Sequence, residues 1–200
     1  TNAFNNAGRV INSSTTAATF TIGSNGGTGT AFGTVEGAIN LTKLGNGVIS
    51  LYNKSTYTGV TTIGGTVNVR VDTLADGGLP SGIGASTSDA ANLVFNGAGG
   101  GIRYDGNIRD GDLTLGSTSA TTDRLFTLDA AATGASIESV VGNNNALVWS
   151  NSGAVVNNTT ADAVITLTGS SAGDNTFNPQ LMDSSAGGGV TLSLVKGGTG

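Results

Sequence analysis

One stretch, Leu41–Val69, constrains the fold of this chain most strongly. It reads LTKLGNGVISLYNKSTYTGVTTIGGTVNV, two apolar runs tied by glycine and by Asn, Ser and Thr turns. Its opening returns as LSLVKGGTG at Leu192–Gly200. Recurrence at a fixed spacing predicts a repeat architecture, in which each unit buries its apolar face against neighbouring units. A shift of 153 residues (194 − 41) superposes Leu41 on Leu194, Lys43 on Lys196, Gly45 on Gly198 and Gly47 on Gly200.

The composition narrows the class of repeat. The 200 residues include 34 Gly but only 2 Pro, and 10% of the residues are charged. Disorder is disfavoured because hydrophobic residues reach 37%. Collagen requires Gly at every third position, which the chain lacks. Because Gly adopts positive φ without strain, the bias indicates a β-rich chain with many tight turns.

Short strand-like runs follow one another along the chain. Val67, Val69 and Val71 alternate with Asn68 and Arg70, a pattern typical of a strand with one buried face. Asn-Gly pairs and Gly clusters separate the runs, and no window carries a helical apolar stripe. The predicted strands are Phe20–Ile22, Val48–Leu51, Thr61–Ile63, Val67–Val71, Leu93–Phe95, Leu113–Leu115, Leu125–Leu128, Leu147–Trp149, Val164–Thr168 and Val190–Val195.

Side-chain size favours stacked coils over a sandwich or a closed barrel. Aromatic residues are only 5% of the chain, and small apolar and hydroxyl side chains dominate. Such side chains suit a narrow interior between coils about 4.8 Å apart. At roughly 20–25 residues per coil, residues 1–200 are expected to form one continuous solenoid segment of about eight to ten coils. Asn143–Asn145 is either a side-chain ladder between coils or a polar loop.

The residues of Leu41–Val69 resemble the autotransporter-associated β-strand repeat, also called the passenger-associated transport repeat. The chain departs mildly from the pattern at Ser55, where Asn is usual, and at Val48, where Thr is usual. Outside this stretch the resemblance is looser, although Asp123–Val155 resembles spacers between such repeats in very large bacterial surface proteins. The matching positions are Leu41, Lys43, Gly45, Gly47, Ile49, Leu51, Tyr57, Gly59, Thr61, Ile63, Gly64, Gly65 and Val67.

The resemblance implies a right-handed parallel β-helix (a β-solenoid) with many Gly and Asn turns, secreted and displayed on the bacterial cell surface. It makes residues 41–69 the best-matching repeat and residues 192–200 the start of the next one. The expected function is that of a non-catalytic extracellular fibre, stalk or adhesin passenger. Expected partners are a continuation of the same chain or identical subunits joined end to end, with glycans or other cells as further candidates.

Each motif position also has a structural role of its own. Gly45 and Gly47 flank a bend that a Cβ would hinder, and Gly64-Gly65 turns the chain into the next strand. Lys43 is expected either to cap a carbonyl group or to lie on the solvent face. Tyr57 and Thr61 suit stacking on adjacent coils.

An enzyme is the least favoured alternative. Without His and Cys, the segment has neither a Ser-His-Asp nor a Cys-His pair. Asp105, Asp110 and Asp112, with Arg103 and Arg109 nearby, could form a polysaccharide lyase-like or calcium site. Their spacing does not follow a known calcium loop, however, and Asp-Gly is a common turn pair. We therefore assign no catalytic, cofactor-binding or metal residue, and leave calcium at these three aspartates open.

A glycan-binding module is the second alternative. Trp149 and Tyr104 could be sugar-stacking platforms, although an isolated aromatic residue in a β stack more often packs internally. A nucleic-acid partner is disfavoured because the net charge is −5 and the 8 Lys and Arg residues are scattered. No apolar run reaches the roughly 18 residues of a membrane span. Around Thr1 there is neither a signal peptide nor a Met, so a piece of a longer protein is expected.

Overall fold

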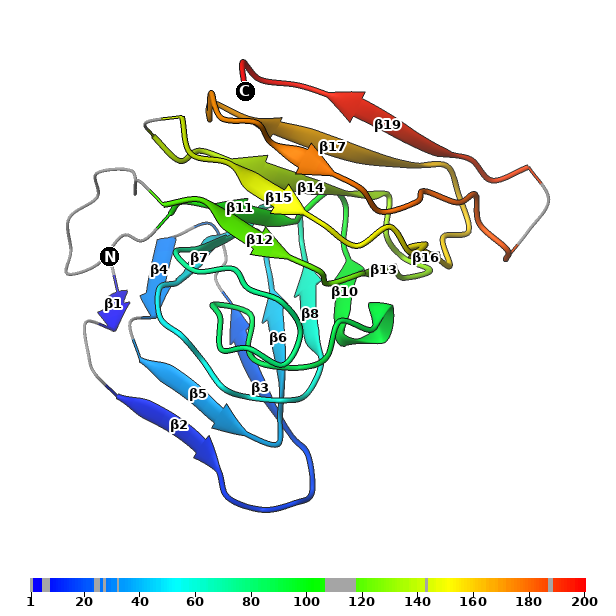
Figure 1. Cartoon of the computed structure of the whole chain (residues 1–200). Coiled ribbons are helices and arrows are strands. Elements are labelled where there is room, and N and C mark those ends of the chain that lie inside the picture. The colour runs from blue at the N-terminus through cyan, green and yellow to red at the C-terminus, as the bar shows by residue number, and fades with distance from the viewer. Residues whose placement is uncertain are drawn as a thin grey trace.

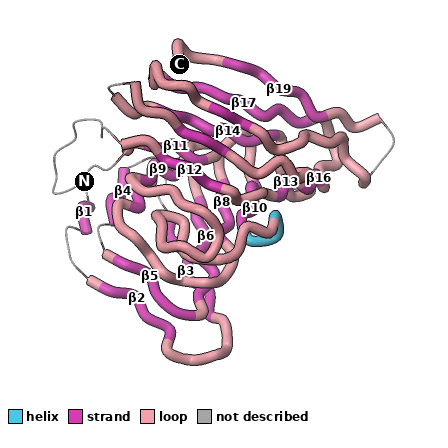
Figure 2. Tube along the Cα trace, in the orientation of Figure 1, coloured by secondary structure: helices cyan, strands magenta, loops and turns pink. Residues whose placement is uncertain are grey.

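The computed structural model describes residues 2–4, 8–23, 26, 28–31, 33–106, 118–142, 144–186 and 189–200. These residues form β-strands and loops, with one short 3₁₀ helix, η1 (Ala90–Asn92) (Figure 2). The expectation of an all-β chain with parallel sheets is therefore confirmed. The predicted strand Leu113–Leu115 and the candidates Arg109, Asp110, Asp112 and Asn143 lie outside the described residues.

Two large parallel sheets organise the molecule. In each sheet, neighbouring strands follow one another in the order in which they occur in the chain. In Figure 1 the strands accordingly run from blue at one end of the stack to red at the other. The eight-stranded sheet contains β1 (Asn2–Phe4), β4 (Thr28–Ala31), β7 (Val48–Leu51), β9 (Val69–Val71), β11 (Ile102–Tyr104), β14 (Gly134–Ser139), β17 (Ala163–Gly169) and β19 (Leu192–Lys196). The six-stranded sheet contains β3 (Ala18–Gly23), β6 (Ile39–Leu44), β8 (Thr61–Gly64), β10 (Leu93–Asn96), β13 (Thr127–Leu128) and β16 (Val156–Asn157).

Two smaller parallel sheets hold strands that lie between these in the chain. They pair β2 (Arg9–Asn12) with β5 (Thr34–Gly37), and β12 (Ala120–Thr122) with β15 (Leu147–Trp149) and then β18 (Thr176–Phe177). The chain thus passes from the eight-stranded sheet to the six-stranded sheet and back, one strand further along each time. This all-β, parallel arrangement is consistent with a β-helix.

The coils differ in length. Ile49 pairs with Val69, an offset of 20 residues (69 − 49), whereas Ile102 pairs with Ile137, an offset of 35 (137 − 102). The expected 20–25 residues per coil therefore holds for the repeat motif but is wrong further along. The coil before it is also long, because Val69 pairs with Ile102 at an offset of 33 (102 − 69). That coil contains residues 72–92, a loop between β9 and β10 in which Ser81 forms an antiparallel bridge with Ser55.

Apolar side chains repeat at the same inward position from coil to coil. On the eight-stranded sheet Ile49, Val69, Ile102 and Ile137 stand in one register row, and all are buried. Such rows follow from the two-residue period of a strand, which points alternate side chains to the same face. Four aromatic residues form a cluster: ring centroids of Phe95 and Phe126 lie 5.2 Å apart, those of Phe126 and Trp149 6.2 Å, and those of Trp149 and Phe177 6.3 Å.

A buried lysine, Lys43, binds carbonyl oxygens at the turns of the repeat motif. Lys43 stands in an inward row between Ile22 and Ile63, and its side chain is fully buried. Its Nζ donates hydrogen bonds to the carbonyl oxygens of Gly45 at 2.7 Å and of Gly64 at 3.1 Å, and to that of Val67 at 3.3 Å. Of its two expected roles, capping carbonyl groups is therefore the correct one, and the solvent-facing role is wrong.

The residues expected to begin a second copy of the motif, Leu192–Gly200, start in the other large sheet. Lys43 belongs to β6 in the six-stranded sheet, whereas Lys196 belongs to β19 in the eight-stranded sheet. Lys196 is exposed, and its Nζ donates to the carbonyl oxygen of neighbouring Gly197 at 2.8 Å. Like Lys43, it occupies an inward row, because Lys196 pairs with Leu167 and Leu167 with Ile137. Within the described residues, no helix has the length and hydropathy required to span a bilayer.

Candidate functional site

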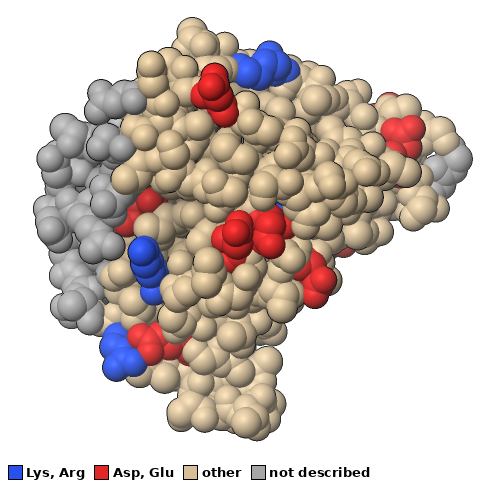
Figure 3. Space-filling view, viewed as in Figure 1, with Lys and Arg blue, Asp and Glu red and all other residues tan. Residues whose placement is uncertain are grey.

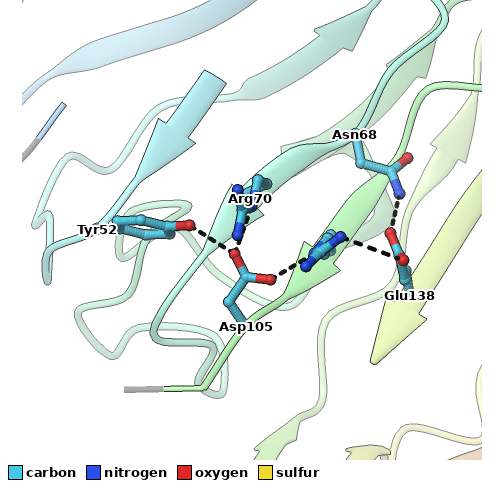
Figure 4. Close-up of polar contacts among 6 residues, drawn as sticks. Tyr52, Asn68, Arg70, Asp105 and Glu138 are labelled. Carbon is cyan, nitrogen blue, oxygen red and sulfur yellow. Dashed lines mark hydrogen bonds and ion pairs between the residues drawn. The ribbon is translucent and has the colours of Figure 1, made fainter. Parts of the chain in front are cut away.

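Asp105 is the centre of a charge cluster on the eight-stranded sheet (Figure 4). The residue directly follows β11 and is fully buried. Its Oδ2 accepts hydrogen bonds from the Tyr52 hydroxyl at 2.7 Å and from Arg70 Nε at 2.6 Å, and its Oδ1 accepts one from Arg103 Nε at 2.6 Å. Figure 3 shows that most of the surface on the face it draws carries neither Lys and Arg nor Asp and Glu.

The parallel register explains why these residues meet. Arg70 on β9, Arg103 on β11 and Glu138 on β14 pair in sequence across the sheet. All three point away from the interior, because the residues on either side of each arginine (Val69 and Val71, Ile102 and Tyr104) are buried. Asn68 Nδ2 donates to Glu138 Oε2 at 3.0 Å, and Arg103 Nη1 lies 3.7 Å from Glu138 Oε1.

Asp105 offsets an electrostatic repulsion that the strand register creates between Arg70 and Arg103. Two like charges directly opposite each other on neighbouring strands repel, and Arg70 and Arg103 are such a pair. One buried carboxylate bound to both guanidinium groups removes this repulsion. The pKa of Arg103 is raised, because contacts with Asp105 and Glu138 outweigh the opposing effect of burial. Burial, followed by the hydrogen bond to Asp105, raises the pKa of Tyr52 to about 12.

A hollow lies over the outward side of this cluster. Its volume is about 380 Å³, which falls in the range of small-ligand sites. We call it the arginine groove. It is lined by Val48, Thr66, Val67, Asn68, Arg70, Gly99, Arg103, Ser136 and Glu138.

Of the three aspartates singled out in the sequence, the structure describes only Asp105. Asp105 holds two arginines and a tyrosine, which is a structural role, and Asp110 and Asp112 lie outside the described residues. Within the described ranges, no three His, Cys, Asp or Glu side chains come together as a metal site would require. Calcium binding by Asp105, Asp110 and Asp112 therefore stays a hypothesis.

Neither proposed sugar platform is available to a ligand. Trp149 is 1% exposed and its indole N–H donates to the carbonyl oxygen of Arg124. Tyr104 is 2% exposed and its hydroxyl donates to the carbonyl oxygen of Thr118 at 3.0 Å. The alternative that these two residues stack on sugar rings is therefore wrong. Both belong to the packed interior, which is the more common role of such aromatic residues.

Sequence reasoning missed a second buried cation, Arg124. Its guanidinium donates to the carbonyl oxygens of Ala75 at 3.2 Å and Gly84 at 3.0 Å, and to Ser86 Oγ at 3.0 Å. These contacts fasten the loop of residues 72–92 to the stack, and burial lowers the pKa of Arg124. The sequence signal was weak: a single arginine at a strand-like run reads as a solvent-facing residue.

Comparison with known proteins identifies a relative of this chain. The chain is 41% identical over 185 residues to a protein described as "Adhesin BmaC autotransporter" from Brucella suis biovar 1 (strain 1330). The alignment covers 92% of this chain but 5% of that protein, so the chain corresponds to a small part of its relative. No protein-family model and no solved structure matches the chain. The similarity supports a relation to autotransporter proteins and leaves the specific repeat family unconfirmed.

Proposed function

We propose that this chain is a segment of the extracellular passenger of an autotransporter-type adhesin, in which it acts as a non-catalytic stalk on the bacterial cell surface. The observation that carries the proposal is the strand order: both large sheets add one parallel strand per coil, in chain order, from one end of the stack to the other. Such a stack lengthens by one strand spacing per coil and gives a rigid rod. The adhesin relative supports the passenger assignment.

The finer fold that we propose is a right-handed β-helix built in part from passenger-associated transport repeats. Parallel strands joined by a crossover in one sheet are right-handed in almost all known cases. Two contacts of the motif residues support this proposal. Lys43 binds turn carbonyl groups of the following coil, and the Tyr57 hydroxyl shares a 2.7 Å hydrogen bond with Thr61 Oγ1 inside the stack.

We further propose that more β-coils join the β19 end, in the same polypeptide or from an identical subunit. Leu194 is 53% exposed although its register row, through Ile165 and Ala135, is otherwise buried. Lys196 stands inward at the same end with one local carbonyl partner, whereas Lys43 has two carbonyl partners on the following coil. A next coil would bury both side chains in the way the interior coils bury theirs.

Tandem fusions test the stalk role. One, two and three copies of residues 1–200 would be purified and measured by small-angle X-ray scattering and negative-stain electron microscopy. The eight-stranded sheet has seven strand spacings, so each added copy should lengthen the particle by at least about 34 Å at constant cross-section. Particles that grow equally in all directions, or separate beads on flexible linkers, would contradict the proposal.

A further inference from the structure

The arginine groove has features that a plain stalk does not require. Arg70 and Arg103 each donate Nε to Asp105 at 2.6 Å. Neither terminal nitrogen of Arg70 donates a hydrogen bond to any described residue, and Arg103 Nη1 reaches only the 3.7 Å contact with Glu138. Both arginines line the hollow. Two guanidinium groups therefore present free donors to one space of about 380 Å³.

The buried carboxylate fixes these donors before any ligand arrives. Asp105 is fully buried and uses both oxygens, while the guanidinium carbon of Arg70 lies 5.9 Å from the centre of the Tyr52 ring. Arginine side chains normally lose rotamer freedom on binding, and holding them in advance removes much of that cost. Paired, fixed guanidinium groups match an oxyanion, and a carboxylate is one that they bind through two parallel hydrogen bonds.

The position of the groove indicates the class of ligand. It spans β7, β9, β11 and β14, three strand spacings or about 14 Å. It lies on a sheet face, where an extended peptide finds no free backbone edge to pair with. Among the described residues, Val48 and Val67 are its only apolar side chains, fewer than a protein interface core needs. Hydroxyl and amide groups of Thr66, Ser136 and Asn68 complete the lining, and they suit a glycan.

We infer that the arginine groove binds an anionic glycan, with a sugar carboxylate on Arg70 and Arg103 and an uncharged sugar beside Glu138. Glu138 selects the second sugar. Its carboxylate stands one strand beyond Arg103, so it repels a second acid group there and accepts hydrogen bonds from hydroxyl or amide groups instead. The groove therefore favours a chain of alternating acidic and neutral sugars over a continuous polyuronate. This binding adds to the stalk role and does not depend on it.

Titration of the whole chain with defined oligosaccharides tests the inference. The probes are a hyaluronan tetrasaccharide (alternating acidic and neutral sugars), tetragalacturonate (acidic throughout) and chitotetraose (neutral), measured by calorimetry and by amide chemical shifts. Wild type should bind the first saturably, with shifts at Asn68, Arg70 and Arg103, bind the second more weakly and not bind the third. Loss of a charged hydrogen bond in Arg70→Gln should weaken binding about 10- to 100-fold.

Three further variants make the result specific. Thr66→Trp fills the groove without touching the ion pairs and should also abolish binding, which keeps the test valid if Arg70→Gln unfolds. Glu138→Gln should raise affinity for tetragalacturonate. Lys54→Gln removes an exposed cation from a different hollow and should bind as wild type does. The inference is overturned if wild type binds none of the acidic probes at millimolar concentration, binds chitotetraose equally well, or loses as much affinity in Lys54→Gln as in Arg70→Gln.

Discussion

Burial of Lys43 shows how a single residue joins two coils. An ammonium group inside a protein is costly unless hydrogen-bond acceptors replace its water. Three backbone carbonyl oxygens do so here, one from its own corner and two from the next coil. Burial lowers the pKa of Lys43. A lysine can therefore stand in an apolar row here, because its ammonium group donates hydrogen bonds to carbonyl oxygens of the turns.

Replacement of Lys43 by methionine should destabilise the fold. Methionine fits the volume of the apolar row but leaves three carbonyl oxygens without their donor, at an expected loss of about 2–3 kcal/mol in the free energy of unfolding. Urea denaturation followed by circular dichroism measures this loss. The control is Lys54→Met, because the Lys54 side chain is exposed and should change stability by less than about 0.5 kcal/mol. Equal stability of the two variants would contradict a capping role for Lys43.

The three tyrosines should resist ionisation while the chain is folded. Burial is the main reason why the pKa of Tyr52 is raised from 10.0 to about 12, and it also raises the pKa values of Tyr57 and Tyr104. A raised folded-state pKa gives stability that is complete below the unfolded value near 10 and is lost as the pH rises toward 12. Ultraviolet titration of tyrosinate should therefore coincide with alkaline unfolding. Ionisation near pH 10 with a native circular dichroism spectrum would contradict this.

At the scale of elements, the corners between strands depend on glycine for two separate reasons. Gly65 has φ of +85°, and a Cβ there would lie 2.1 Å from the carbonyl oxygen of Gly45 on the coil before. Gly78, in the loop of residues 72–92, has φ of +84° but no atom within 4 Å of an added Cβ. An added side chain thus meets backbone strain alone at Gly78, and both backbone strain and close packing between coils at Gly65.

Alanine substitution at these glycines should therefore give unequal losses. Gly78→Ala should cost about 1–2 kcal/mol, the expected strain of a left-handed backbone. Gly65→Ala adds a collision with backbone and should cost more than about 3 kcal/mol. Denaturant midpoints at unchanged m-value measure both losses. If the two variants unfold at the same midpoint, close contact between coils at the Gly65 corner is disproved.

Strand position could be predicted well where apolar residues alternate. The predicted Val48–Leu51 and Leu147–Trp149 match β7 and β15 at both ends, and most other predicted strands overlap observed ones. Strands rich in Gly, Ser, Thr or Glu were missed, among them β5 and β14. Pairing with other coils sets these strands, β14 between β11 and β17 and β5 beside β2, and this tertiary context overrides a weak local pattern.

For the whole molecule, stability should vary along the stack. Each coil contacts mainly its neighbours, so interior coils have two partners and end coils have one in this chain. Ile63, Phe95 and Ile102 in the middle are fully buried, whereas Leu194, in an inward row at the β19 end, is 53% exposed. The middle of the stack should therefore open least often.

Amide hydrogen exchange should reveal this gradient. Amides of β8, β9, β10 and β11 should exchange slowest, at rates set by global unfolding, and those of β19 should exchange fastest among the strands of the eight-stranded sheet after β7. In a two-copy fusion, β19 of the first copy should gain protection, because a following coil then covers it. Uniform protection along the single chain would show that the stack unfolds as one unit.

The sequence by itself determined the all-β class, the corner glycines and most strand positions, because these depend on local alternation and on the φ values that only glycine adopts freely. It did not determine which coil lies beside which, since offsets between paired strands vary from 20 to 35 residues. Only the tertiary register brings Tyr52, Arg70 and Arg103 around Asp105, up to 53 residues apart in the chain. The same register buries Lys43 and leaves Lys196 exposed, although both lie in similar motifs, because only Lys43 has a following coil to supply its acceptors in this structure.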